Sequence, residues 1–103
     1  MHLIQLLLPL YDNDGRETPK SELRRVADEL TERFGGLTVH SRAPAEGLWE
    51  EPSDGERVRD DVVIYEVMVE ALDVEWWRAY RESLERRLRQ EELVVRASEI
   101  RRI

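Results

Sequence analysis

The sequence predicts an α+β fold in which two helices cover one face of a four-stranded antiparallel sheet. Three observations predict it: a length suited to one hydrophobic core, two helix-like apolar stripes set among strand-like runs, and a second half that repeats the plan of the first. The chain has 103 residues, of which 41% are hydrophobic and 38% charged. These values are typical of a small globular protein. We therefore treat residues 1–103 as a single domain.

The first half reads as strand, helix, strand. Residues 3–8 form an apolar run that Pro9 ends, which is typical of a buried central strand. Thr18-Pro19 marks a helix start, because a hydroxyl can cap the helix and proline loses nothing at its first position. Gly35-Gly36 then ends the helix, and residues 37–42 alternate as a second strand. The apolar stripe of the helix comprises Leu23, Val26, Ala27, Leu30 and Phe34.

The second half repeats this order. Residues 58–71 hold a run rich in β-branched side chains, which predicts a long third strand. Asp73 is expected to cap a second helix, and residues 93–100 supply the last strand. We expect Trp77 in the core and Trp76 as a shield for the first helix. The apolar stripe of this helix comprises Val74, Trp77, Leu84 and Leu88.

The resulting β-α-β-β-α-β order is that of the ferredoxin-like fold. Right-handed crossovers place the strands in the order 4-1-3-2, with both helices on one face of the sheet. The other face is then left without cover, and it becomes the candidate functional surface.

Alternation along each strand sorts the side chains onto the two faces. The helix side is expected to hold Ile4, Leu6, Leu8, Leu37, Val39, Val63, Tyr65, Val67 and Val69. On the open side we expect Leu3, Leu7, Ile64, Met68 and Val94 around the polar residues Gln5, Thr38, His40, Arg42, Glu66 and Arg96, with Ser98 nearby. Soluble monomers seldom expose a continuous apolar patch of this kind. The sequence therefore predicts a homodimer through the sheet face, a small-molecule ligand bound there, or both.

His40 and Glu66 are the best candidates for catalytic residues. A histidine beside a carboxylate can act as an acid–base pair, but the same pair can also be a structural hydrogen bond. A change of one residue in strand register would move His40 to the opposite face. The candidate ligand-binding residues are Gln5, Thr38, His40, Arg42, Trp49, Glu66 and Met68.

Residues 43–57 form a long connection, and connections of this length are often functional. Trp49 within it has two readings: it closes over a pocket on the sheet as part of a lid, or it fills the edge of the core or the dimer seam.

The composition argues against several classes of function. The net charge of −7 disfavours nucleic-acid binding, which depends on a basic surface. The chain has no cysteine and only two histidines, so we expect neither a metal site nor a cofactor. The apolar residues 1–10 are too few to span a membrane and lack the features of a secretion signal. We expect no membrane association and a cytoplasmic location.

Three short motifs resemble a family of small uncharacterised bacterial proteins. They are Phe34 to Val39 with its Gly-Leu-Thr strand, Gly47-Leu48-Trp49 as a G-x-W loop, and Arg89 to Val95 as a C-terminal Q-x-x-V segment. The resemblance covers roughly residues 30–97 and implies a ferredoxin-like fold. It implies little about activity.

Two functions follow from these observations. The first is a dimeric, non-catalytic module that binds a ligand or a partner through the open sheet face and the 43–57 connection. The second is a small cofactor-independent enzyme, similar to a monooxygenase or an isomerase, in which His40 or Glu66 transfers a proton. A concave pocket of about 300 Å³ or more that contains both side chains would favour the enzyme.

Overall fold

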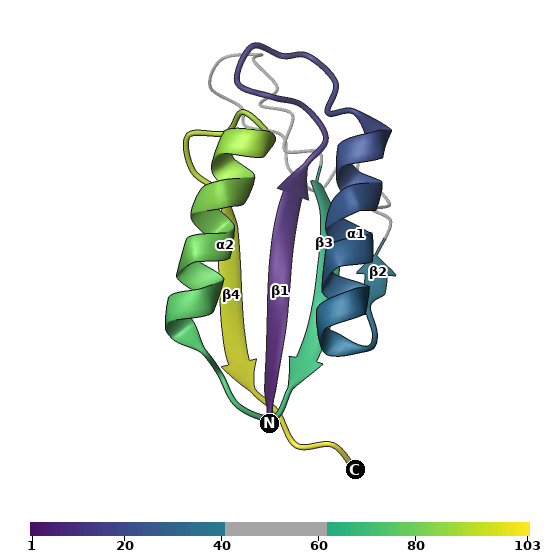
Figure 1. Ribbon diagram of the computed structural model, residues 1–103, viewed down its shortest axis with the longest axis vertical. Coiled ribbons are helices and arrows are strands. Elements are labelled where there is room, and N and C mark those ends of the chain that lie inside the picture. Colours follow the sequence, from purple (N-terminus) through teal and green to yellow (C-terminus); the bar gives the residue numbers. More distant parts are fainter. Residues whose placement is uncertain (41–61) are drawn as a thin grey trace, which may run out of the picture.

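The computed structural model describes residues 1–40 and 62–103, which form two helices and a four-stranded sheet (Figure 1). The strands are β1 (His2–Pro9), β2 (Thr38–His40), β3 (Val62–Val69) and β4 (Val94–Glu99). The helices are α1 (Lys20–Phe34) and α2 (Val74–Arg87). The predicted element order is confirmed for these residues.

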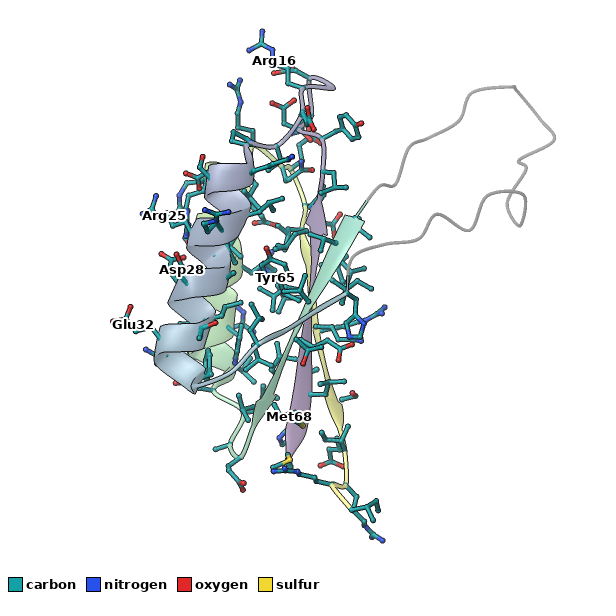
Figure 2. All side chains as sticks on the ribbon, turned by 90° about the vertical axis from the view of Figure 1, so that its right-hand side faces the viewer. Arg16, Arg25, Asp28, Glu32, Tyr65 and Met68 are labelled. Atoms are coloured by element: carbon teal, nitrogen blue, oxygen red, sulfur yellow. The ribbon has the colours of Figure 1, made fainter. Side chains whose placement is uncertain are left out.

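The sheet is antiparallel throughout, in the order β2-β3-β1-β4. Starting from the β4 edge, this is the predicted order 4-1-3-2. Both helices lie on one face of the sheet, as the side view in Figure 2 shows. No helix of residues 1–40 and 62–103 lies on the opposite face.

The core lies between the helices and the sheet and follows the predicted alternation. The buried strand residues are Ile4, Leu6, Leu8, Val63, Tyr65, Val67 and Val69, and the helices add Val26, Leu30, Trp77 and Leu84. Tyr65 lies between the sheet and α1 in Figure 2, and its hydroxyl donates to the Leu23 carbonyl at 2.9 Å. Burial raises the pKa of Tyr65, which fits its role as a core residue.

Val39 does face the helix side, opposite Tyr65, but it is 46% exposed. Val39 therefore points toward the helix side as predicted, but the prediction that it packs into the core is wrong. The reason is that β2 has only three residues and lies at the edge of the sheet.

The start of α1 differs from the prediction. Thr18 does not cap the helix: α1 begins after Pro19, and no side chain caps it. The Thr18 side chain is instead buried, and its hydroxyl donates to the Pro9 carbonyl at 2.9 Å. Because this bond satisfies the last carbonyl of β1, Thr18 joins the end of the strand to the start of the helix.

The features of α2 are largely as predicted. The Asp73 carboxylate accepts from the Trp76 amide at 3.1 Å and so caps the helix. Trp77 is buried, whereas Trp76 packs edge-on against Phe34 of α1 at 5.4 Å. Val74 is 49% exposed and does not join the core as the stripe predicted. It borders a hollow between α2 and β4 that the short side chains of the strand do not fill.

A charged cluster holds the two helices together. The Glu29 carboxylate of α1 accepts from the Tyr80 hydroxyl at 2.9 Å and from the Arg87 guanidinium at 2.8 Å, both on α2. Partial burial raises the pKa of Glu29, but the hydrogen bonds from Arg87 and Tyr80 outweigh this effect and leave the pKa below its ordinary value. Burial and the same carboxylate raise the pKa of Tyr80. The cluster thus links α1 to α2.

The two glycines after α1 provide a test of the helix end. Gly35 has a left-handed backbone with φ +81°, whereas Gly36 does not, and neither has a neighbour that an added methyl group would meet. We expect Gly35→Ala to lower the free energy of unfolding by about 1 kcal/mol, because a left-handed conformation disfavours any Cβ. Gly36→Ala is the matched control and should cause no loss. Urea unfolding of the two variants measures the difference, and equal stabilities would contradict the assignment.

Candidate functional site

The strand register places the open-face side chains in rows that cross the sheet. Gln5 of β1 pairs with Glu66 of β3 on one side and with Arg96 of β4 on the other. Thr38 of β2 pairs with Glu66, and His40 pairs with Ile64. Directly paired residues share a face of the sheet. One row of polar side chains therefore crosses all four strands near the middle of the sheet: Thr38, Glu66, Gln5 and Arg96.

Side-chain contacts link Arg96, Gln5 and Glu66 of this row to one another and to His40 of the neighbouring row on β2. The Arg96 Nε donates to the Gln5 Oε1 at 2.8 Å, and the Gln5 Nε2 donates to the Glu66 Oε1 at 2.9 Å. The His40 Nε2 lies 3.2 Å from the same Glu66 oxygen. We call Arg96, Gln5, Glu66 and His40 the polar row, although His40 is paired with Ile64 and its side chain reaches Glu66 from the next row.

The chemistry of the end groups fixes the orientation of the amide between them. An arginine can only donate, and an ionised carboxylate can only accept. Gln5 must therefore turn its oxygen to Arg96 and its nitrogen to Glu66, as the structure has it. A glutamine at this position links two opposite charges without bringing them into contact.

Glu66 is held in its charged form. The hydrogen bond from Gln5 contributes most to lowering the pKa of Glu66, partial burial opposes it, and the hydrogen bond and charge of His40 lower it further. Its side chain is 21% exposed, against 51% for His40. Glu66 is therefore a weaker base than an ordinary glutamate.

Apolar side chains flank the polar row on both sides. One side holds a row of Val94, Leu7 and Ile64, and the other holds Leu3 and Met68. Met68 is 52% exposed, although it lies on an inner strand. The middle of the open face is thus a polar row between two mainly apolar rows, of which one ends in His40 on β2 and the other in Ser98 on β4.

Three of the predicted site residues, Gln5, His40 and Glu66, come together in the polar row. Thr38 lies directly across from Glu66 and is exposed. Met68 is on the same face but in the apolar row next to Leu3. Arg42, Trp49 and the 43–57 connection lie outside the described residues.

Arg96 was placed on the open face by the sequence but was not among the predicted site residues. The alternation of the last strand identifies its face. Its bond to Gln5 follows only from the pairing of β4 with β1, which the sequence does not specify at single-residue precision.

The two best-formed hollows among the described residues contain neither His40 nor Glu66. The first, of about 200 Å³, lies between α2 and β4 beside Trp77, Arg78 and Arg81. Both of these arginines are already paired, Arg78 with Glu75 at 2.9 Å and Arg81 with Glu85 at 3.0 Å. The second lies on the outer surface of α1, where Figure 2 labels Arg25 and Asp28.

Within residues 1–40 and 62–103, no cluster of three or more carboxylate or imidazole side chains is arranged to hold a metal ion. The same residues include no helix with the length and apolar character needed to cross a membrane.

Comparison of the chain with protein-family models, with curated proteins and with solved structures finds no match. The resemblance to small bacterial proteins therefore stays a prediction. One of its motifs also departs from the pattern, because Leu93 rather than valine is the third residue after Gln90.

The polar row makes a testable prediction about acid titration. We expect Gln5→Leu to raise the pKa of Glu66, because the Gln5 hydrogen bond is the largest single contribution to the lowered value, and we expect His40→Ala to raise it as well. Since the folded-state pKa is lowered, Glu66 adds stability above its unfolded pKa and loses it as pH falls through the folded value. Carbon-detected NMR titration of the Glu66 carboxyl in the wild type and both variants measures the shifts. An unchanged Glu66 pKa in Gln5→Leu would contradict the prediction.

Proposed function

We propose that this chain is a non-catalytic binding module of ferredoxin-like architecture that forms a homodimer through its open sheet face. The observation that carries the proposal is the polar row, whose groups are hydrogen-bonded to one another while apolar side chains surround them. Such a face is suited to being covered by another protein surface.

The energetic argument concerns desolvation. A polar side chain that loses water without gaining a partner costs free energy, about 1 to 3 kcal/mol in proteins. Gln5 already has partners for both its oxygen and its nitrogen within the sheet. The polar row therefore costs less to cover than four isolated polar groups would. Covering Leu3, Leu7, Ile64, Met68 and Val94 then provides the favourable term.

The alternative is a cofactor-independent enzyme that uses His40 or Glu66, and the 3.2 Å contact between them is in its favour. Two observations weigh against it. The lowered pKa makes Glu66 a poor base at neutral pH. Among residues 1–40 and 62–103, the two best-formed hollows lie away from the pair. A binding role for His40 and Glu66 requires neither a strong base nor a hollow that contains both side chains.

The remaining parts of the proposal rest on composition. The net charge of −7 is unsuited to nucleic acid, and a chain without cysteine has no need of an oxidising compartment. We therefore propose a cytoplasmic protein whose partner is another protein surface, with a small ligand as a further occupant of the face.

A pair of matched substitutions tests the role of the open face. Met68 and Val74 are exposed to similar extents, 52% and 49%, but only Met68 is on the open face. We expect Met68→Glu to weaken dimerisation about a hundredfold, because it places an unpaired carboxylate in the covered surface at a cost of about 3 kcal/mol. Val74→Glu, at the first turn of α2, should leave dimerisation unchanged.

Sedimentation equilibrium over a range of protein concentrations measures both effects, and circular dichroism confirms that each variant is folded. A wild-type chain that stays monomeric at high micromolar concentration would refute the proposal. So would a dimer that Val74→Glu weakens as much as Met68→Glu does.

A further inference from the structure

We infer that the surface covering the open face is that of a second copy, related by a two-fold axis that runs parallel to the strands between β1 and β3. The inference rests on the proposed function and specifies how the two sheets meet. It follows from the strand order, the row arrangement and the positions of the charges.

The strand order determines which strands face each other. The order is β2-β3-β1-β4, so an axis along the strands and between the two inner ones stacks β1 on the partner's β3. It also stacks β4 on the partner's β2. Each row then lies on the same row of the partner, because a rotation about this axis does not change the position along a strand. Two packed sheets are about 10 Å apart, which lets side chains of facing rows interdigitate.

Row matching places like surfaces together. Leu7 lies over the partner's Ile64 in one apolar row, and Leu3 lies over the partner's Met68 in the other. The polar row lies on the partner's polar row. The apolar side chains are thus removed from water while the hydrogen-bonded groups stay in contact with polar groups.

The charges select this axis over the perpendicular one. Arg96 is on β4 at one edge, and Glu66 is on β3 beyond the middle of the sheet. With the axis along the strands, Arg96 is offset sideways from the partner's Glu66 by one strand spacing of about 5 Å, across the gap of about 10 Å between the sheets, which the arginine and glutamate side chains together can span. With an axis along the rows, every strand would lie on its own copy, and Arg96 would meet the partner's Arg96. Opposite charges across an interface favour the first arrangement.

Glu66 can accept the additional bond. The contacts from Gln5 and His40 both go to its Oε1. A carboxylate has two oxygens and about four acceptor positions. The partner's Arg96 would therefore complete the site around Glu66, and each dimer would hold two such contacts.

Cysteine cross-linking tests the arrangement, because the natural chain has no cysteine of its own. One chain carries Leu3→Cys, and a second, isotopically labelled chain carries Met68→Cys. The comparison pair is Leu3→Cys with Leu7→Cys. A thiol cross-linker of about 8 Å suits sheets packed about 10 Å apart. Mass spectrometry identifies the products that join the two different chains.

We expect the 3–68 pair to cross-link efficiently and the 3–7 pair at least tenfold less. With the axis along the strands, Leu3 and the partner's Leu7 are separated along the strand by four residues, or about 14 Å. With the perpendicular axis these two residues would face each other, and the 3–7 pair would cross-link in place of the 3–68 pair. That result would overturn the inference.

Charge exchange provides a second measurement that does not depend on cysteine. Arg96→Glu alone and Glu66→Arg alone should each weaken dimerisation at least tenfold, and an equal mixture of the two chains should restore it as a heterodimer. Wild-type affinity in both single variants would overturn the contact between Arg96 and Glu66.

The two levels of the proposal fail differently. If sedimentation shows that the wild-type chain forms no dimer, the proposed function and this inference are refuted together. A stable dimer that Met68→Glu disrupts but in which the 3–68 pair does not cross-link would overturn only the inferred axis.

Discussion

The pairing register between β1 and β3 is the constraint on which the rest of the structure depends. It places Gln5 opposite Glu66, and it therefore decides which side chains share each face. A shift of one residue would bring core residues such as Leu6 to the open face and Gln5 into the core. The buried residues Ile4 and Leu8 oppose that shift, because both would lose their packing against the helices. The hydrophobic core thus fixes the polar chemistry on the opposite face.

The open face combines two properties that rarely occur together on a solvent-exposed surface. Its charged groups hold one another in fixed positions, and its apolar groups lie in continuous rows on either side. An acid–base site needs a group whose proton is ready to move, whereas here a glutamine amide holds the carboxylate of Glu66 in its charged form. Under the proposed binding function, the row would offer a partner a pattern of charge that is asymmetric between β4 and β2.

Much of the fold followed from the sequence because periodicity identifies faces. The alternation in β1 and β3 correctly placed seven buried side chains, and it placed Gln5 and Glu66 on the other side. Local signals were less dependable where tertiary contacts compete with them. Thr18 has the features of a helix cap, yet its hydroxyl bonds to the end of β1 instead. The contact between Arg96 and Gln5 could not be predicted, because it requires the exact register of strands that are about 90 residues apart.

The central position of β1 has a consequence for how the molecule acquires its structure. Both neighbours of β1, the strands β3 and β4, come from the second half of the chain. The paired residues nearest in sequence are Pro9 and Val62, and the most distant are His2 and Glu99. During synthesis this apolar segment therefore emerges from the ribosome long before either strand that will pair with it. Such long-range pairing slows folding and leaves an unpaired, aggregation-prone strand in the nascent chain. A chaperone that shields residues 2–9 until β3 and β4 have been made would meet the need that this topology creates.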